Sequence, residues 1–472
     1  MAAACCAALA AAGSVLLPNT SAYNQTQASY WSLQESSLSP SCFAQPQTAQ
    51  QAANLITILT SHQACSTTDF AIKCQTHAPA AGFANIAGGV TIDITGLNSI
   101  SVSEDHSIAY VGAGNSWLDV YAYLDPYNKS VAGGRNGAVG VGGLTIGGGI
   151  SYFSPQVGWT CDTVQNFEVV LASGELVNAN ATSNPDLYRA LKGGKNNFGL
   201  VTRFDFATVD ITRILGGNLV NDIADRAAVF AAFADFTTAP DYDVHASWVL
   251  STIFNATSKA WTLLNVPVYT LPDTRPLVYE QLYAVPNISD NLALTELHVL
   301  ANQTATPPLN WGMGTATYGV STAFLNEIFD IVNATIYDFN LPGGVAWSIA
   351  FEPLPTVFLA PGAGKNVLGT TPADGNQMIF LTSPFWTDSS ADAEVHAKTE
   401  EILTKVNAAA EKAGLLRQFE YANYADYSQQ PFEGYGQSNL EFLLQTSKQY
   451  DPNGMFQKRV PGGFKLPGGQ WW

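Results

Sequence analysis

Two segments rich in small residues constrain this chain more than any other feature. The first, residues 70–85 (FAIKCQTHAPAAGFAN), ends a predicted strand and carries His77 into a turn. The second, residues 139–151 (VGVGGLTIGGGIS), is rich in glycine. Backbone N–H groups reach phosphate oxygens only where side chains are absent, and glycine permits the dihedral angles of such turns. The pair therefore predicts a site for a long pyrophosphate cofactor.

Two common nucleotide-binding patterns are missing from these segments. A Walker loop needs a lysine before Ser or Thr, and neither segment has one. A Rossmann unit needs a strand, a GxGxxG turn, a helix and an acidic residue about 20 residues further on, which cannot be traced here. The sequence therefore points away from both classes.

The two segments resemble the vanillyl-alcohol-oxidase type of flavoprotein, specifically fungal berberine-bridge-enzyme-like oxidoreductases. In that family a Lys/Arg-x-Gly-Gly-His strand end supplies a histidine bonded to the 8α-methyl group of FAD. A segment beginning Cys-x-x-Val-Gly-Val-Gly-Gly follows. Here Gln75 and Thr76 replace the two glycines, and Asn136 stands where a second covalent cysteine would be. The resemblance implies FAD attached through His77 alone.

Three further segments extend the resemblance over most of the chain: residues 162–174, 186–204 and 421–466. The implied fold is α+β, a two-domain vanillyl-alcohol-oxidase-type flavoprotein. Residues 1–209 would form the N-terminal part of a discontinuous FAD-binding domain. Residues 210–417 would form a substrate-binding domain, an antiparallel sheet backed by helices. Residues 418–472 would return to the FAD-binding domain.

Hydrophobic periodicity predicts the main elements independently of the resemblance. Strands are expected at 70–73, 90–94, 108–112, 245–254 and 260–269. Helices are expected at 47–60, 117–124, 225–236 and 391–413. The alternation of short strands and helices up to about residue 209 favours an α+β lobe, whereas the longer strands beyond it favour an antiparallel sheet.

Length and charge narrow the class of protein. A chain of 472 residues is too long for one ordinary core, so two domains are expected. The net charge of −18 disfavours nucleic acid as a partner. No stretch approaches the roughly 20 strongly apolar residues of a transmembrane helix. The family resemblance, and not the composition, implies a small-molecule substrate and O₂ as the partners.

Eight Asn-x-Ser/Thr sequons predict a secreted or secretory-pathway glycoprotein carrying N-glycans. They begin at Asn19, Asn24, Asn128, Asn180, Asn255, Asn287, Asn302 and Asn333. The N-terminal MAAACCAALAAAG lacks the basic region of a signal peptide. We expect residues 3–12 to form a short docking helix, and a separate cleaved leader is left open.

The six cysteines lack zinc-ligand spacing, and no metal site is expected. The family resemblance favours a disulfide from Cys5 or Cys6 to Cys65, tying the N-terminal helix to the first lobe. The sequence does not fix the connectivity. Cys74 and Cys161 are equally compatible with small buried hydrophobic residues.

The resemblance also implies a set of cofactor-binding residues. They are Lys73, Gln75, Thr76, His77, Val139, Gly142, Gly143, Thr145, Gly148, Asp162, Val164, Gly199, Val201, Asn423 and Asn453. In the family, the residue at the place of Val139 flanks the oxygen pocket. Valine there goes with oxidase behaviour, and leucine with dehydrogenase behaviour.

Tyr421 and Tyr424 are the catalytic candidates. A tyrosine that acts as a base near neutral pH needs its pKa of about 10 lowered by a cation or by the flavin. Glu352 and Tyr121 are further candidates, and the general base stays open.

Three functional hypotheses follow. The first is a secreted FAD-dependent oxidase that transfers hydride from a secondary metabolite or sugar-like alcohol and reduces O₂ to H₂O₂. The alternative is a cyclase or pericyclase that keeps the flavin fold and acts without net redox. The third is a non-enzymatic glycoprotein that has lost flavin. Gln75 and Thr76 support the third, whereas the glycine pair Gly142–Gly143 and His77 argue against it.

Overall fold

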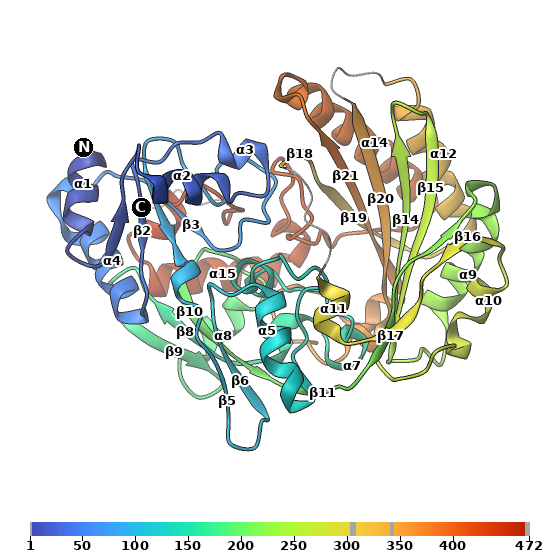
Figure 1. The fold of residues 1–472 in the computed structure, drawn as a ribbon, viewed down its shortest axis with the longest axis horizontal. Coiled ribbons are helices and arrows are strands. Elements are labelled where there is room, and N and C mark those ends of the chain that lie inside the picture. Colours follow the sequence, from blue (N-terminus) through green and yellow to red (C-terminus); the bar gives the residue numbers. More distant parts are fainter. Residues whose placement is uncertain (1, 303–307, 340–343, 468–472) are drawn as a thin grey trace.

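The computed structural model describes residues 2–302, 308–339 and 344–467 and contains two bodies of secondary structure (Figure 1). The first body holds two small sheets. One has the order β1 (Ser14–Leu16), β2 (Cys42–Gln45), β4 (Val90–Asp93), β3 (Phe70–Lys73). The other has the order β5 (Ile100–Val102), β6 (Ile108–Gly112), β10 (Leu200–Ala207), β8 (Val164–Val170), β9 (Leu176–Asn180).

The strands of the two sheets pair differently. Strand β4 runs parallel to both β2 and β3, so β3 ends beside β4 with Lys73 opposite Asp93. The second sheet is antiparallel throughout. Because β3 ends at Lys73, the chain leaves the sheet at that edge and carries residues 74–79 away from it.

Helices flank the first body: α1 (Ala2–Leu9), α2 (Ser21–Ala28), α3 (Leu33–Ser36), α4 (Ala49–Ser61), α5 (Trp117–Leu124), α6 (Val141–Ile146), α7 (Ser154–Val157), α8 (Pro185–Leu191), α15 (Gln437–Tyr450) and α16 (Met455–Lys458). Thr48 caps α4 by accepting a hydrogen bond from the Gln51 amide at 3.2 Å. The buried residues of α4 recur at helical spacing, as an amphipathic helix requires.

The C-terminal segment packs onto the N-terminal part of the chain. The rings of Phe70 and Phe456 meet edge to face at 6.2 Å, and Arg459 donates hydrogen bonds to the carbonyl oxygens of Leu59, Cys65 and Thr68. One hydrophobic cluster therefore contains both segments. The domain boundaries at residues 209 and 417 remain predictions.

The second body is an 11-stranded antiparallel sheet, which we call the large sheet. Its main path is β16 (Asn287–Asp290), β13 (Leu219–Asn221), β15 (Ala260–Tyr269), β14 (Ala246–Asn255), β20 (Val345–Leu354), β21 (Gln377–Trp386), β19 (Gly314–Gly319), β22 (Leu416–Arg417). Three strands lie off this path: β12 (Ile214–Gly216) pairs with β15 and with β17 (Ala293–Thr295), and β18 (Asn310–Trp311) pairs with β21. A separate two-stranded pair joins β7 (Lys129–Ser130) to β11 (Val209–Asp210).

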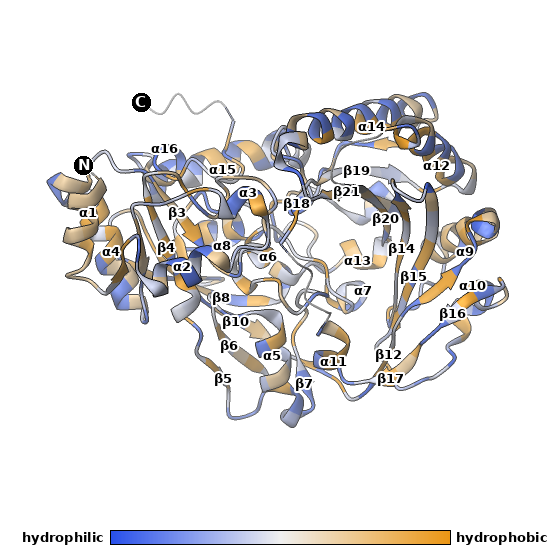
Figure 2. Ribbon diagram, turned by 45° about the horizontal axis from the view of Figure 1, so that its top comes forward, coloured by the Kyte–Doolittle hydropathy of each residue, from blue (hydrophilic) through white to orange (hydrophobic). Residues whose placement is uncertain are grey.

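Helices cover one face of the large sheet, and the first body lies on the other side (Figure 1). The covering helices are α9 (Arg226–Thr238), α12 (Thr322–Ile336) and α14 (Asp392–Lys412). Figure 2 shows both hydrophilic and hydrophobic residues along α14, as expected of an amphipathic helix with one face exposed to solvent. The shorter α10 (Glu280–Tyr283), α11 (Leu297–Ala301) and α13 (Thr356–Leu359) lie in the connections.

The fold class predicted from the sequence is confirmed. The expected strands at 70–73, 108–112 and 260–269 and the expected helix at 117–124 have the predicted bounds, and the other elements shift by one or two residues at their ends. The expected N-terminal helix is α1. Among the described residues, no helix has both the length and the apolar character to cross a membrane.

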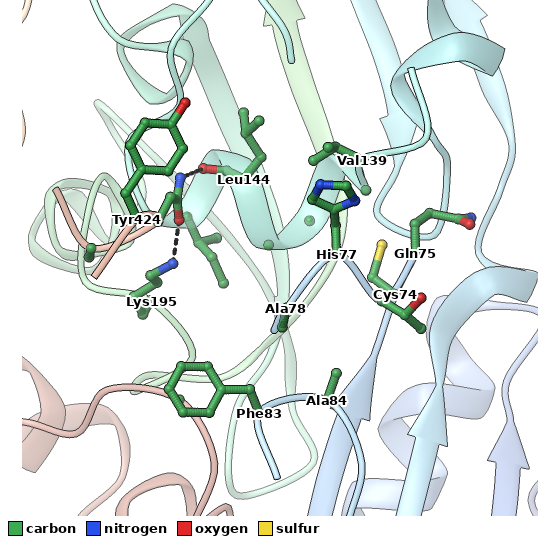
Figure 3. Close-up of a pocket in the computed structure, with 18 of the residues that line it drawn as sticks. Cys74, Gln75, His77, Ala78, Phe83, Ala84, Val139, Leu144, Lys195 and Tyr424 are labelled. Carbon is green, nitrogen blue, oxygen red and sulfur yellow. Dashed lines mark hydrogen bonds between the residues drawn. The ribbon is translucent and has the colours of Figure 1, made fainter. Parts of the chain in front are cut away.

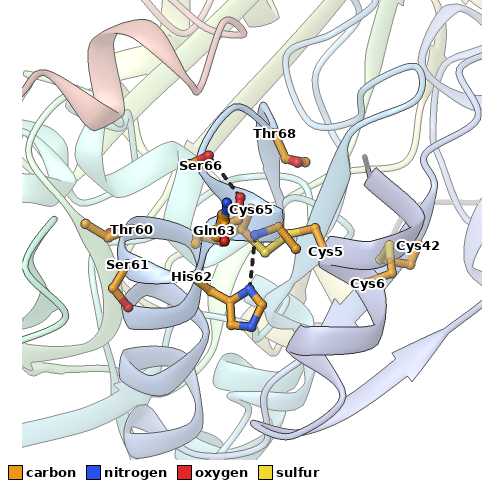
Figure 4. The surroundings of a disulfide bond; sticks show 12 residues. Cys5, Cys6, Cys42, Thr60, Ser61, His62, Gln63, Cys65, Ser66 and Thr68 are labelled. Atoms are coloured by element: carbon orange, nitrogen blue, oxygen red, sulfur yellow. Dashed lines mark hydrogen bonds between the residues drawn. A yellow bond between two sulfur atoms is a disulfide. The ribbon is translucent and has the colours of Figure 1, made fainter.

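Two disulfides tie α1 to the first body (Figure 4). Cys5 is bonded to Cys65, and Cys6 is bonded to Cys42 in strand β2. The bridge to Cys65 implied by the resemblance is therefore made by Cys5. Cys74 and Cys161 are free, the latter fully buried.

Candidate active site

A cavity of about 470 Å³ lies between the first body and the large sheet. Most of its lining comes from the first body, and the large sheet contributes Val249, Val266 and the nearby Met313. Eleven of the predicted site residues line it: Gln75, Thr76, His77, Val139, Gly142, Gly143, Gly199, Val201, Tyr421, Asn423 and Tyr424. Segments far apart in the sequence thus meet at one site.

Some predicted residues lie behind the cavity wall. Lys73 is buried and pairs with Asp93 at 3.4 Å. Thr145 is buried within α6, where its Oγ1 donates to the Val141 carbonyl at 2.7 Å. Gly148 has a positive φ of 108°, and a Cβ there would contact Trp159 and Tyr421 at 3.4 Å.

Three other predicted residues do not line the cavity. The Asp162 carboxylate accepts hydrogen bonds from the Trp159 amide at 3.0 Å and from Asn366 at 2.9 Å, so it orders a turn. Val164 is buried at the start of β8. Asn453 is exposed in the turn before α16, and it does not line the cavity.

His77 sits on the cavity wall beside Val139 (Figure 3). Its imidazole stacks on Trp31, with ring centroids 4.1 Å apart and planes 19° apart. Burial lowers the pKa of His77 to about 4, because desolvation disfavours the charged ring. The imidazole is therefore neutral at physiological pH, and a neutral ring nitrogen has a lone pair available for bonding.

The glycine segment forms the wall next to His77. A Cβ on Gly140 would lie 2.7 Å from Cys74 Sγ, so the backbone at Gly140 can approach Cys74 this closely only because glycine has no side chain. A Cβ on Gly143 would meet no protein atom within 4 Å, although Gly143 lines the cavity. This part of the wall is thus bare backbone facing open space, as a bound dinucleotide requires.

A second group of contacts orders the far wall. Lys195 donates a hydrogen bond to Asn423 Oδ1, and Asn423 Nδ2 donates to the Leu144 carbonyl at 3.0 Å (Figure 3). Asn423 Nδ2 also donates to the Tyr421 hydroxyl at 2.9 Å, which accepts a further bond from the Gly149 amide at 3.1 Å. Tyr421 therefore positions Asn423 and the glycine segment.

Lys195 was not among the predicted site residues. Burial lowers its pKa to about 7, so its ammonium group is held where charge is costly. An anionic group of a bound cofactor or substrate would offset that cost. Its position inside the glycine-rich loop KGGKNNFG was the signal that could have singled it out.

Tyr424 belongs to a buried three-residue network. Arg135 Nη2 donates to the Tyr424 hydroxyl at 2.7 Å and to Glu352 Oε1 at 2.6 Å. The Tyr424 hydroxyl in turn donates to Glu352 Oε1 at 3.0 Å. Among the described residues, Glu352 Oε2 is buried without a hydrogen-bond partner. Tyr121, the other candidate base, donates its hydroxyl proton to the Gly134 carbonyl at 2.7 Å.

A tyrosine base at neutral pH needs a lowered pKa, and the structure gives Tyr424 the opposite shift. Burial, reinforced by the Glu352 carboxylate, raises the pKa of Tyr424 well above its usual value despite the nearby Arg135. Burial alone would lower the pKa of Arg135, but Glu352 raises it above its usual range. Tyr424 therefore rests as a phenol beside a permanent cation.

The lining fits a flavin dinucleotide. It offers a neutral histidine, a stretch of bare glycine backbone, a buried lysine and an anchored amide in Asn423. Gln75 and Thr76, which replace the glycines of the family motif, both line the cavity without closing it.

Comparison with known proteins supports the same class. A family model for an FAD-binding domain matches residues 40–180. The FAD-dependent monooxygenase CTB5 of Cercospora beticola is 32% identical over 98% of this chain and 92% of its own length. The FAD-dependent monooxygenase drtC of Aspergillus calidoustus is 33% identical over 94% of this chain and 86% of its own.

A solved structure shows the same fold. Glucooligosaccharide oxidase from Acremonium strictum, which carries a 6-S-cysteinyl, 8α-N1-histidyl FAD, has a TM-score of 0.77 to this chain. The match covers 99% of this chain and 98% of that oxidase at 19% identity.

Fold and cavity together define an FAD-dependent oxidoreductase of the vanillyl-alcohol-oxidase type. The chain belongs to the family of fungal FAD-dependent monooxygenases that includes CTB5 and drtC.

Proposed function

We propose that this protein is an FAD-dependent oxidase. Its substrate is a small organic molecule with a C–H bond next to a hydroxyl, amine or phenol group. The observation that carries the proposal is the Tyr424 hydroxyl, held between Arg135 and Glu352 at the wall of the cavity. Such a group can remove a proton from a substrate hydroxyl while hydride leaves the adjacent carbon.

The network provides a path for that proton. The substrate hydroxyl proton passes to the Tyr424 oxygen while the Tyr424 proton passes to Glu352 Oε1, 3.0 Å away. The Arg135 guanidinium, 2.7 Å from the same oxygen, stabilises the negative charge that develops there. This relay needs no phenolate at rest, which agrees with the raised pKa of Tyr424.

The cofactor would be held by His77, the backbone of Gly142 and Gly143, and the Lys195–Asn423 pair. Bound FAD supplies the acceptor for the hydride. We propose that the link is through His77 alone, because Asn136 occupies the place of the second covalent cysteine. Forming the C–N bond of this link would release one proton from the imidazole, one proton from the 8α-methyl group and two electrons. Oxygen would accept the two electrons and two protons and become H₂O₂.

Oxygen is the proposed electron acceptor because Val139 lines the cavity beside His77. A small side chain there leaves room for O₂. The similar proteins CTB5 and drtC are named monooxygenases, so insertion of an oxygen atom into product is the second candidate. A cyclisation without net redox is the third.

Reoxidation by O₂ tests the proposal without knowledge of the substrate. The purified protein is reduced anaerobically with one equivalent of dithionite and mixed with air-saturated buffer. We expect one H₂O₂ per flavin, with reoxidation at least tenfold slower in Val139→Leu and unchanged in Val139→Ala. Equal rates in wild type and Val139→Leu would contradict the role of Val139, and slow reoxidation of all three proteins would contradict an oxidase.

A substrate panel separates the candidate functions. Phenolic alcohols and oligosaccharides are incubated with the protein under ¹⁸O₂. H₂O₂ formation without ¹⁸O in the product supports the oxidase, whereas ¹⁸O in the product identifies a monooxygenase. Conversion without O₂ consumption identifies a cyclase.

We also propose passage through the secretory pathway. Two disulfides and exposed sequon asparagines at Asn19, Asn24, Asn128, Asn255 and Asn287 support it. The sequon of Asn302 extends into residues 303 and 304, outside the described residues. Glycosidase treatment of the protein from its native source, followed by mass measurement, tests this proposal.

A further inference from the structure

Thr76 has a backbone conformation that its side chain disfavours. Its φ is +63°, in the left-handed region, where a β-branched residue is an outlier. The family motif has glycine at this position, which would adopt the same φ without strain. A compensating interaction is therefore needed to hold Thr76 in place.

The hydroxyl of Thr76 supplies that interaction. Its Oγ1 donates to the Ser29 carbonyl at 3.1 Å and accepts from the Trp31 amide at 3.2 Å. Thr76 is 5% exposed, so water competes little for these bonds. Both bonds are unavailable to a glycine, and together they fix the backbone that leads into Trp31.

Trp31 in turn lies between two rings. One face stacks on His77 at 4.1 Å, and Trp31 also stacks on Trp311 of strand β18 at 4.4 Å and 20°. Gln34 holds Trp311 through two backbone hydrogen bonds of 2.9 and 3.1 Å. The stack therefore runs from His77 to the large sheet.

The Trp31 stack is the contact that sets the plane of the His77 ring. Across residues 2–302, 308–339 and 344–467, no hydrogen bond to the imidazole is found. Without Trp31 the ring would be free to rotate about its side-chain torsions.

We propose that Thr76 and Trp31 form a clamp that fixes the His77 imidazole for attachment to the cofactor. Both are positioning residues, and the proposal rests on the covalent link through His77 proposed above. The clamp also explains why this chain tolerates Thr in place of a glycine: the hydroxyl that comes with the strained residue orders the segment that carries Trp31.

The test measures attachment rather than turnover. Apoprotein is mixed with FAD, and the acid-insoluble flavin is followed with time, while the native spectrum reports total bound FAD. We expect Trp31→Ala to slow covalent attachment at least tenfold with total binding retained, and Trp31→Phe to restore most of the rate. Thr76→Val should slow attachment several-fold, whereas Thr76→Ser, which keeps the hydroxyl, should not.

The pH dependence separates positioning from general destabilisation. In wild type the rate of covalent attachment should rise with pH, with a midpoint near pH 4, because only the neutral imidazole reacts. Removing the Trp31 ring hydrates His77, so the midpoint in Trp31→Ala should move up toward 6.5. Trp261→Ala, which removes a ring packed on Phe254 and Phe329 in the second body, is the matched control and should shift neither midpoint nor rate.

The outcomes are distinct. Wild-type rate and midpoint in both Trp31→Ala and Thr76→Val would overturn the clamp while leaving the His77 link intact. A loss of rate in Trp261→Ala equal to that in Trp31→Ala would also overturn it. Wild-type protein without acid-insoluble flavin would overturn the clamp together with the covalent link.

Discussion

Arg135 and Glu352 are 217 residues apart in sequence, yet Arg135 Nη2 lies 2.6 Å from Glu352 Oε1. Arg135 belongs to the first body, and Glu352 lies on strand β20 of the large sheet. Both side chains are largely buried, with 17% and 4% exposed. The ion pair therefore joins the two bodies at the cavity and holds the Tyr424 hydroxyl between them.

The proton path through Tyr424 to Glu352 predicts a loss of catalytic activity in two variants. Tyr424→Phe removes the oxygen that accepts the substrate proton, and Glu352→Gln removes the final acceptor. We expect kcat to fall about 10² to 10⁴-fold in each, with flavin content unchanged. Steady-state kinetics and the absorption spectrum check both points. Full activity in Tyr424→Phe would remove this residue from the proton path.

The buried ion pair makes a prediction about stability. Arg135→Gln leaves the Glu352 carboxylate buried without its cation, and we expect a loss of about 3 kcal/mol in the free energy of unfolding. Arg135→Gln combined with Glu352→Gln should recover much of that loss, because the uncompensated charge is gone. Urea denaturation of the two single variants and the double variant measures this coupling. Additive losses would show that the pair contributes nothing beyond its separate members.

Two glycines of the same segment should respond differently to alanine. A Cβ on Gly147 would lie 2.1 Å from Asn423 Oδ1 and 2.7 Å from Lys195 Nζ, so Gly147→Ala should lower the thermal stability of the apoprotein. Gly143→Ala meets no protein atom within 4 Å, so apoprotein stability should not change. Because Gly143 lines the cavity, its methyl group should weaken FAD binding at least tenfold. Calorimetry and flavin titration measure the two effects, and unchanged FAD affinity in Gly143→Ala would place the cofactor elsewhere.

Lys195 predicts a pH dependence of apoprotein stability. Its pKa is about 7 in the folded protein and about 10.4 in an unfolded chain. Between these values the unfolded state binds more protons, so the contribution of Lys195 to stability rises with pH. The free energy of unfolding of wild type relative to Lys195→Met should rise by about 1 kcal/mol per pH unit in this window. A difference independent of pH would mean that Lys195 is not desolvated.

Local signals predicted much of the fold. Helix α5 has the expected bounds because Ser116 and Asp119 form a capping box at its start, while Asp125 and Pro126 follow its end. Strand β3 is indicated by the apolar residues Phe70 and Ile72, which have the two-residue spacing of one strand face, and by the small residues that follow the strand. These features are encoded within a few neighbouring residues.

The parts of the site that were not predicted depend on long-range packing. Arg135 had no local motif to connect it with Glu352, since the two meet only when the large sheet packs on the first body. The same holds for Trp31, which reaches Trp311 across 280 positions of sequence. Asn453 shows the opposite case, where a motif was recognised but the residue lies on the surface.

The central claim is that this chain holds FAD through His77. The most direct measurement is the absorption spectrum of the purified protein before and after acid precipitation, for wild type and His77→Ala. The account predicts a yellow wild-type pellet with flavin bands and, for His77→Ala, flavin released to the supernatant. Wild-type flavin found only in the supernatant would contradict the covalent link, and a colourless native protein would contradict FAD binding itself.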